Sequence, residues 1–322
     1  MRGMILAAGF GTRLWPLTVD RTKPAVPFLN RPLISYSVEY LKQFGINEII
    51  INLHHEPESI KELLGDGSRF GVSIEYSEEP AILGTSGALD KVRHLLERDT
   101  FVVINGKIVT NIDLNAAIRT HRRRGALATL VLRENRKREH FTIVEVNGAG
   151  NIARFAGFPE AKASADLLPP PLMFTGIQVL DPAIFNYIPR GVFSHSTVHV
   201  YPRAIAEGET IAAHIADGDW FEMSTLERYL DISIEFLHRG GQRVICGKGS
   251  IIEEGAEVED GVIWDRSRVC AGATLRRVVV ADDVIVPAGS RFENAIIVRA
   301  DHCARIERGE VIGGNLVVYL QG

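Results

Sequence analysis

The last third of this 322-residue chain repeats itself every 17 residues. The side chains that recur at this spacing are aliphatic, glycine or small, and the aligned triples are Ile252, Val269, Val286; Gly255, Gly272, Gly289; Ala256, Ala273, Ser290; Val258, Leu275, Phe292; and Val262, Val279, Ile296. A short fixed period is typical of a solenoid, in which each repeat forms one coil stacked on the next. Because the period is close to three sixes, we expect three short parallel strands per coil. The register fails after about Ala300, and 316–320 is predicted to be a closing strand.

The chain before the repeat follows a different pattern, because apolar runs of strand length alternate with helical patterns. Strands are predicted at 4–8, 46–53, 72–76, 101–104, 127–132 and 173–180, and helices at 32–44, 57–64, 86–96, 114–124 and 225–238. A hairpin is expected at 141–155, around the turn Asn147-Gly148. This alternation indicates an α/β fold with a doubly wound, mostly parallel sheet. We therefore expect two domains, 1–240 and 241–322.

Composition narrows the class of protein. A net charge of −4 gives no electrostatic footprint for nucleic acid, and no apolar run approaches the length that spans a membrane. The first predicted strand begins directly after Met1-Arg2-Gly3, so we expect no signal peptide. The three cysteines are too few and too scattered for a disulfide framework or a zinc site. The sequence predicts a cytoplasmic protein that binds neither nucleic acid nor membrane.

The first predicted strand ends in a turn with two glycines, Gly9 and Gly11. Such a turn can aim several backbone N–H groups into one concavity, and Arg13 adds a planar fork of donors beside it. In doubly wound sheets the ligand lies beyond the carboxyl ends of the strands, which is where this turn falls. Lys23 follows in a segment stiffened by prolines and can deliver a second positive charge. The pattern predicts a site for phosphate groups.

Two common phosphate motifs do not fit this turn. The dinucleotide fingerprint needs a third glycine where Leu14 stands, and the P-loop needs a Gly-Lys-Ser/Thr sequence that the chain lacks. The segment matches instead the signature of the sugar-1-phosphate nucleotidyltransferases, the nucleotide-sugar pyrophosphorylases: Gly9-x-Gly11-Thr12-Arg13-Leu14-x-Pro16-Leu17-Thr18, then Lys23-Pro24 and Pro27. The chain resembles this family from residue 1 to about 238. Its repeat resembles the left-handed β-helix of hexapeptide repeats that several members carry at their C-terminus.

The resemblance implies a reaction and a set of site residues. A sugar-1-phosphate oxygen would attack the α-phosphorus of a nucleoside triphosphate and pyrophosphate would leave, with no covalent enzyme intermediate. Arg13 would hold the triphosphate and the leaving pyrophosphate, and Lys23 the sugar phosphate or the α-phosphate. The residues implied to bind the nucleotide are Ala8, Gly9, Gly11, Thr12, Arg13, Glu78, Gly84 and Thr85. Those implied to bind the sugar phosphate are Lys23, Thr142, Phe158 and Thr175.

The nucleobase is indicated only by a pair of carboxylates. A carboxylate at Glu78 or Glu79 could accept both donors on the edge of guanine, whereas uracil and thymine offer one donor beside an acceptor. This favours GTP. A solvated pair of surface glutamates is the alternative.

The chain departs from the family where the resemblance implies Mg²⁺. The family's Gly-Asp pair reads Gly106-Lys107 here, and ammonium cannot ligate magnesium. The family's second metal carboxylate falls in a Trp-x-Asp-x-Gly-Thr segment, where this chain has Glu222. Our hypothesis is that Lys107 replaces part of the metal's charge near the α-phosphate and that Glu222, the remaining candidate metal ligand, orients it.

The sugar side departs as well. The family's Tyr-Gly reads Phe141-Thr142 and its Glu-Lys-Pro reads Gly157-Phe158-Pro159, with Lys162 as a nearby cation that could reach back. The segments 65–71, 174–176 and 225–228 resemble the branch that contains N-acetylmuramate-1-phosphate uridylyltransferase and heptose-1-phosphate guanylyltransferase. The resemblance favours a mannose-like or heptose-like sugar phosphate.

Two functions stay open. The first is an enzyme that makes a nucleotide-sugar. The presence of both Arg13 and Lys23 favours it. The second is a catalytically impaired regulatory subunit that binds a nucleotide or nucleotide-sugar, which Lys107, Gly157 and Phe158 favour. Hexapeptide helices also occur in acyltransferases, but three coils are short for an enzyme and His302 is the only histidine in the repeat region. We expect the repeat to serve in capping or in assembly of a homo-oligomer.

Overall fold

The computed structural model describes residues 1–158 and 169–321, and the chain forms two compact units. Unit 1 comprises Met1–Gly9, Tyr36–Pro57 and Leu64–Trp220, and unit 2 comprises Phe10–Ser35, Glu58–Leu63 and Phe221–Gly322. Segment 10–35 belongs to the same unit as the repeat, and the division into domains 1–240 and 241–322 stays a prediction. Each unit is described below by itself.

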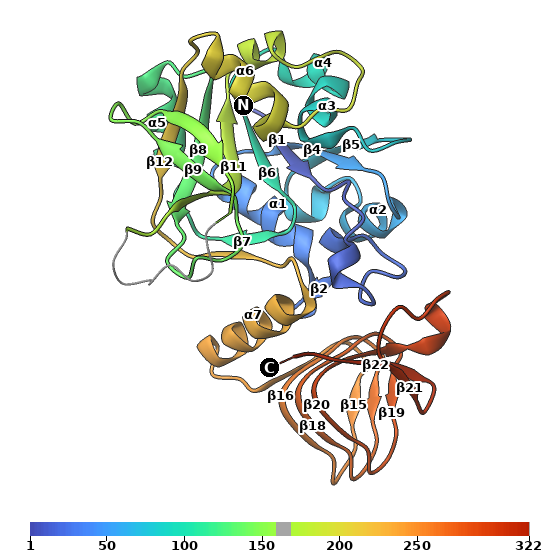
Figure 1. The fold of residues 1–322 in the computed structure, drawn as a ribbon. Coiled ribbons are helices and arrows are strands. Elements are labelled where there is room, and N and C mark those ends of the chain that lie inside the picture. The colour runs from blue at the N-terminus through green and yellow to red at the C-terminus, as the bar shows by residue number, and fades with distance from the viewer. Residues whose placement is uncertain (159–168, 322) are drawn as a thin grey trace. The chain divides into compact units, whose positions relative to one another are not determined.

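Unit 1 is built on a nine-stranded sheet. Its strands are β1 (Gly3–Leu6), β4 (Glu48–Leu53), β5 (Ser73–Glu78), β6 (Phe101–Asn105), β8 (Ala128–Glu134), β9 (Ile143–Val146), β10 (Ile152–Ala156), β11 (Leu172–Leu180) and β12 (Ile211–Ile215). The core order β6-β1-β4-β5 is parallel, whereas β11 runs antiparallel between β6 and β8 (Figure 1). The predicted α/β class and the hairpin β9-β10 are confirmed, and the antiparallel β11 makes the sheet mixed.

Helices lie on both faces of this sheet. Among the described residues before 207, the α-helices are α1 (Leu33–Gln43), α2 (Glu58–Leu64), α3 (Gly84–Lys91), α4 (Arg93–Leu96), α5 (Leu114–Arg124) and α6 (Tyr201–Ala206). Side chains of α3, α4 and α6 pack with Met4 and Leu130 in one buried cluster. On the opposite face, His121 of α5 contacts Thr129 of β8, whose side chain alternates with that of Leu130. The sheet is therefore doubly wound.

Helix α5 shows how local sequence sets an element. Asp113 caps it by accepting a hydrogen bond from the Ala116 amide at 3.2 Å, and Gly125 ends it with φ of 53°. Both ends were predicted. The helix predicted at 86–96 is broken instead into α3 and α4 at Val92, and no helix was predicted at α6.

Buried histidines in unit 1 give a pH-dependent stability. Burial lowers the pKa of His121 and His214 below the usual 6.5, and each ring contacts a threonine hydroxyl at 3.1 Å. In the unfolded chain both histidines take up a proton near pH 6.5, so the unfolded state binds more protons just below that pH. We expect the free energy of unfolding to fall as the pH drops from 6.5, by at most about 1.4 kcal/mol per pH unit for each histidine. Denaturant titrations at pH 7.5 and 5.5 measure this, and His121→Asn should reduce the difference. Equal stability at both pH values would contradict it.

The repeat in unit 2 forms a parallel β-helix. Its strands are β14 (Val244–Cys246), β15 (Ile251–Ile252), β16 (Glu257–Ile263), β17 (Arg268–Val269), β18 (Thr274–Val280), β19 (Ile285–Val286) and β20 (Arg291–Arg299). The strands stack in parallel, and Val258, Leu275 and Phe292 pair in one column. The predicted spacing of 17 residues is thus confirmed. The fold is the left-handed β-helix, and Figure 1 shows its stacked coils.

Each coil turns at three corners where the backbone has a positive φ. The corner residues recur at the same spacing and are Gly249, Arg266, Asp283; Gly255, Gly272, Gly289; and Asp260, Arg277, Asn294. The third set bends the long strands β16, β18 and β20 in their middle. A coil therefore has three sides, as the period predicted.

The end of the repeat and the remaining short elements complete unit 2. β22 (Asn315–Tyr319) pairs antiparallel with β20 and with β21 (Glu310–Ile312), which confirms the predicted closing strand. Helix α7 (Leu226–Arg239) is capped by Thr225, whose hydroxyl accepts from the Arg228 amide at 3.3 Å. The short strands elsewhere are β2 (Pro27–Phe28), β3 (Arg31–Pro32), β7 (Ile108–Thr110) and β13 (Trp220–Glu222). Within 1–158 and 169–321, no helix is both long and apolar enough to cross a membrane.

Candidate functional site

The carboxyl ends of four parallel strands meet at one edge of the sheet in unit 1. Leu6 pairs with Asn105 of β6 and with Asn52 of β4, and Leu53 pairs with Glu78 of β5. The segments that follow these strands carry several predicted site residues: Ala8 and Gly9 after β1, Glu78 at the end of β5, and Lys107 after β6. This edge is where a doubly wound sheet binds its ligand.

A buried hydrogen-bond network ties three of these loops together. The side-chain oxygen of Asn52 accepts from the Ala7 amide at 2.9 Å, and its nitrogen donates to Glu79 at 2.7 Å. The second oxygen of Glu79 accepts from the Leu83 amide at 2.9 Å. Asn52 and Glu79 are each 3% exposed. Both oxygens of Glu79 are thus engaged within the protein, whereas Glu78 is exposed.

The start of α3 carries the predicted residues Gly84 and Thr85. Gly84 has φ of 75°, and a Cβ there would lie 2.4 Å from the Ser194 carbonyl oxygen, so no other residue fits. The Thr85 amide donates to His195 Nδ1 at 3.3 Å, and its hydroxyl accepts from the Ser196 amide at 2.9 Å. Burial, and then the neighbouring His199, lowers the pKa of His195, so the ring is neutral at pH 7 and can accept this hydrogen bond. Segment 194–196 therefore fixes the first turn of α3.

Unit 2 holds the two cationic residues of the signature. Arg13 is exposed in the short helix η1 (Thr12–Leu14), and Lys23 begins η2 (Lys23–Ala25) with 8% of its surface exposed. Gly11 packs directly on Lys23, because a Cβ on Gly11 would lie 2.9 Å from the Lys23 Cβ. The turn that carries Arg13 and the segment that carries Lys23 are thus in contact at Gly11.

Replacing Gly11 by alanine should destabilise this contact. Gly11 has φ of 71°, which costs an L-residue about 1–2 kcal/mol, and the added methyl group would push against Lys23. We expect Gly11→Ala to lower the free energy of unfolding by about that amount or more and to weaken pyrophosphate binding. The matched control for stability is Gly9→Ala, since a Cβ at Gly9 would have no heavy atom within 4 Å apart from its chain neighbours. Denaturant unfolding of both variants measures the difference, and equal losses would contradict the prediction.

A cavity of about 390 Å³ lies beside Arg13 within unit 2. Three segments line it, namely the signature turn, the start of α7 and the chain after the last coil; the residues are Thr12, Arg13, Trp15, Thr225, Glu227, Glu307 and Arg308. Arg308 also donates to the Trp15 carbonyl at 3.1 Å. The sequence predicted Thr12 and Arg13 but not Glu307 or Arg308, which come after the repeat register is lost. A triphosphate or pyrophosphate that met Arg13 would meet this cavity.

The two residues of the metal hypothesis lie in different units. Lys107 belongs to unit 1, directly after Gly106, whose amide donates to the Leu6 carbonyl at 3.0 Å. Glu222 belongs to unit 2 and is 3% exposed, and its backbone carbonyl accepts from the Arg228 guanidinium at 3.0 Å. Within the residues that the structure describes, no group of three or more histidine, cysteine or acidic side chains could hold a metal ion. A direct Lys107–Glu222 pair stays a prediction.

The predicted sugar-phosphate residues differ in exposure. Thr142 is exposed before β9, and Phe158 is 54% exposed and stacks on His140 with 3.8 Å between ring centres. Thr175 is 1% exposed and its hydroxyl donates to the Val131 carbonyl at 2.8 Å, so its side chain is part of the sheet core. Pro159 and Lys162 lie outside the described residues.

Asn52 is a residue of this site that the sequence analysis missed. It is a polar residue within the apolar run Ile49–Leu53, and a buried polar group in a core strand needs a hydrogen-bond partner. That interruption of the run is the signal that could have identified it.

Comparison with known families supports this description. The family model of nucleotidyl transferases matches residues 2–239, and the model of the GlmU-like C-terminal hexapeptide domain matches residues 238–318. The two matches meet close to the expected division at 240/241.

Three known proteins illustrate the similarity. UTP–glucose-1-phosphate uridylyltransferase of Synechocystis is 32% identical over 71% of this chain and 61% of its own length. Mannose-1-phosphate guanylyltransferase of Mycobacterium tuberculosis is 28% identical over 85% of this chain and 82% of its own length. The crystal structure of a putative glucose-1-phosphate thymidylyltransferase from Bacillus anthracis shares the fold, with a TM-score of 0.61 over 77% of this chain and 98% of that one, at 24% identity.

Proposed function

Since the chain belongs to the nucleotidyl transferase family, we propose that it transfers a nucleoside monophosphate from a nucleoside triphosphate to a sugar-1-phosphate. In this reaction an oxygen of the sugar phosphate forms a bond to the α-phosphorus, the bond from the α-phosphorus to the bridging oxygen breaks, and pyrophosphate leaves with both bonding electrons. The products are a nucleotide-sugar and pyrophosphate. The protein's contribution is positioning and neutralisation of phosphate charge.

The observation that carries this proposal is the contact between the two cationic segments at Gly11. It holds the turn of Arg13 against the segment of Lys23, and Arg13 lines a cavity with room for a polyphosphate. We assign Arg13 to the triphosphate and the leaving pyrophosphate, and Lys23 to the sugar phosphate or the α-phosphate. A guanidinium suits the first role because its planar fork can bind two phosphate oxygens at once.

For the nucleobase we propose guanine, and Glu78 as the residue that recognises it. Both oxygens of Glu79 accept hydrogen bonds within the protein, from Asn52 and from the Leu83 amide, whereas Glu78 is exposed at the end of β5. A carboxylate at this position can accept the two donors on the guanine edge. The guanylyltransferase of M. tuberculosis is consistent with this choice, whereas the Synechocystis relative is a uridylyltransferase. For the sugar we propose a mannose-like or heptose-like 1-phosphate.

The donor set does not fit a magnesium site of two carboxylates, because Lys107 stands where the resemblance implies aspartate. Lysine donates hydrogen bonds and cannot ligate Mg²⁺. We propose that the Lys107 ammonium supplies fixed positive charge at the α-phosphate and that Glu222 orients it.

A catalytically impaired regulatory subunit is the second candidate, and Lys107 is also the observation that favours it. The two candidates differ in one measurement, the release of pyrophosphate across a panel of four nucleoside triphosphates and several sugar-1-phosphates. Turnover with any pair supports the enzyme and identifies its base and sugar. Binding of a triphosphate without release for any pair would identify the regulator.

We further propose a cytoplasmic location and assembly into a homo-oligomer through the β-helix. All three cysteines lie in the described part of the chain and are free thiols, as expected in a reducing compartment. The exposed side chains of Ile251 and Ile285 lie in one column of the β15-β17-β19 face, on either side of Arg268, and offer apolar contacts for a second copy. Sedimentation of the purified chain tests the assembly.

A further inference from the structure

The signature segment and the β-helix are joined by a largely buried ion pair within unit 2. The Arg21 guanidinium lies 2.8 Å from the Asp282 carboxylate, with 21% and 16% of the two side chains exposed. The same guanidinium donates to Asp20 at 2.8 Å and lies 5.4 Å from the centre of the Trp264 ring, which is 2% exposed. Arg21 stands two residues before Lys23, so this contact fixes the backbone that leads into the predicted phosphate ligand.

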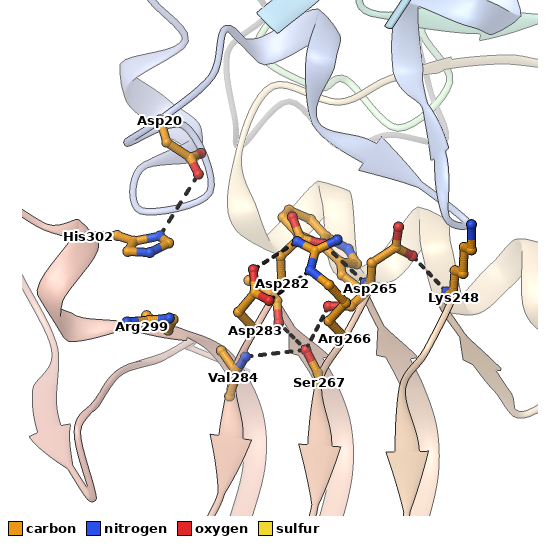
Figure 2. A network of polar contacts seen from close by, with 12 residues as sticks. Asp20, Lys248, Asp265, Arg266, Ser267, Asp282, Asp283, Val284, Arg299 and His302 are labelled. Atoms are coloured by element: carbon orange, nitrogen blue, oxygen red, sulfur yellow. Dashed lines mark hydrogen bonds and ion pairs between the residues drawn. The ribbon is translucent and has the colours of Figure 1, made fainter. Parts of the chain in front are cut away.

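Asp282 is itself fixed by the stacking of the coils. Its second oxygen accepts from the Asp265 amide at 3.0 Å, and Asp265 accepts from the Lys248 amide at 2.7 Å. Each step of this ladder crosses one coil of 17 residues, and Figure 2 shows Asp282, Asp265 and Lys248 in line along the β-helix. One oxygen of Asp282 is thus held by the coil and the other is directed at Arg21. The β-helix presents this carboxylate rigidly.

The segment is held at two further points. Arg308, from the chain after the last coil, donates to the Trp15 carbonyl at 3.1 Å. His302 lies 3.9 Å from the second Asp20 oxygen, and Figure 2 shows these two side chains facing each other. Trp15 stands two residues after Arg13. The C-terminal part of the chain therefore contacts this segment at Trp15, just after Arg13, and at Asp20 and Arg21, just before Lys23.

We propose that the β-helix is part of the phosphate-binding site, with Asp282 and Arg308 as positioning residues that hold segment 13–23 in its binding geometry. The inference rests on the proposed function, because it assigns to Arg13 and Lys23 the binding of one polyphosphate. Binding and transfer of phosphate groups depend steeply on where the charges lie, and a displacement of about 1 Å can cost about 100-fold in rate. The β-helix supplies the rigid support that a loop of this length lacks.

The decisive comparison is Asp282→Asn against Asp283→Asn in the full chain. Asp283 is the matched control, because its carboxylate accepts two hydrogen bonds of 2.8 Å from Arg266 of the neighbouring coil and none from the segment that carries Arg13 and Lys23. Inorganic pyrophosphate is titrated calorimetrically into each variant, and circular dichroism and thermal unfolding report the fold. We expect Asp282→Asn to raise the pyrophosphate Kd at least about tenfold and to lower kcat/KM in the panel assay, whereas Asp283→Asn changes neither. Equal pyrophosphate affinity of the two variants would overturn the inference.

A second pair of variants keeps the test valid if Asp282→Asn fails to fold. Arg308→Ala removes the contact to Trp15, and Arg305→Ala is the exposed control on the same segment. Because Arg308 also lines the cavity beside Arg13, Arg308→Ala is measured in the wild-type chain and in an Arg13→Ala chain. A residue that acts by positioning Arg13 weakens binding in the first and not further in the second. We expect only Arg308→Ala to weaken pyrophosphate binding. The ion pair is tested further by a double-mutant cycle, in which Arg21→Ala combined with Asp282→Asn should weaken binding no more than either change alone. Additive losses would exclude a joint action of the two side chains.

The outcomes separate this inference from the function on which it rests. A wild-type chain that binds pyrophosphate while Asp282→Asn and Arg308→Ala bind it equally well would overturn the positioning role and leave the proposed function standing. A wild-type chain that binds neither pyrophosphate nor any nucleoside triphosphate would overturn both.

Discussion

Replacing Arg13 by alanine should lower kcat/KM for the nucleotide about 100- to 1,000-fold, which corresponds to about 3–4 kcal/mol of lost transition-state stabilisation. Arg13 is exposed in the signature turn and lines the cavity beside it, so the substitution removes a guanidinium without removing a buried group. Charge on the leaving pyrophosphate increases as the bond to the α-phosphorus breaks. The loss should therefore fall on kcat as well as on triphosphate affinity.

Two further variants make this result specific. Arg13→Lys keeps the charge but loses the planar fork, and we expect it to recover only part of the activity. Arg119→Ala removes an arginine that is 66% exposed and far in sequence from the signature, and it should leave the kinetics unchanged. Steady-state kinetics with saturating sugar phosphate measures all three. Unchanged triphosphate affinity in Arg13→Ala would remove the basis of the proposed function.

Replacing Lys107 by alanine should lower turnover about 100- to 1,000-fold, because a fixed cation at a transferring phosphoryl group is worth that much. Lys107 follows β6 at the carboxyl edge of the sheet, next to the end of β1. If its ammonium supplies charge at the α-phosphate, the wild-type enzyme should keep part of its turnover when divalent ions are chelated. Measuring pyrophosphate release with Mg²⁺ and with chelator tests this directly.

Two substitutions distinguish the contribution of the positive charge of Lys107 to turnover from that of its side-chain geometry. Lys107→Arg retains a positive charge and should retain part of the turnover. Lys107→Asp exchanges the charge for a carboxylate of the kind that the resemblance implies, and we expect it to be active only with Mg²⁺. A wild-type enzyme with a strict Mg²⁺ requirement, together with unchanged or higher activity of Lys107→Asp, would count against a built-in cation.

The architecture of this chain could be predicted from its sequence because its patterns are strict. The alternation of apolar runs gave the α/β sheet, and the spacing of 17 residues gave the register of the coils. Two of the three corner sets escaped prediction, because each contains an arginine, Arg266 or Arg277, a residue type with no preference for a positive φ. Stacking of neighbouring coils imposes those backbone angles, and a single coil in isolation gives no sign of them.

Candidate site residues could be predicted from the sequence only where they lie close together in one motif. Arg13 and Lys23 lie ten residues apart in one motif, so the sequence alone brings them together. Asn52 and Glu79 act through contacts that depend on the pairing of β1, β4 and β5. Arg308 reaches Trp15 across 293 residues of chain, from a segment without repeat or motif. Contacts of this kind follow from the tertiary fold and have no local signature.

The ladder that ends at Asp282 constrains how a chain of this design can change in length. Inserting or deleting one turn of the solenoid upstream of Asp282 would move its carboxylate along the axis by one strand spacing, about 4.8 Å, and out of reach of Arg21. Insertions that follow Asp282, between the last turn and β22, would leave the Arg21–Asp282 ion pair intact but displace Arg308. The number of turns is therefore tied to the geometry of segment 13–23, the proposed phosphate-binding segment, and this solenoid cannot be treated as an interchangeable module.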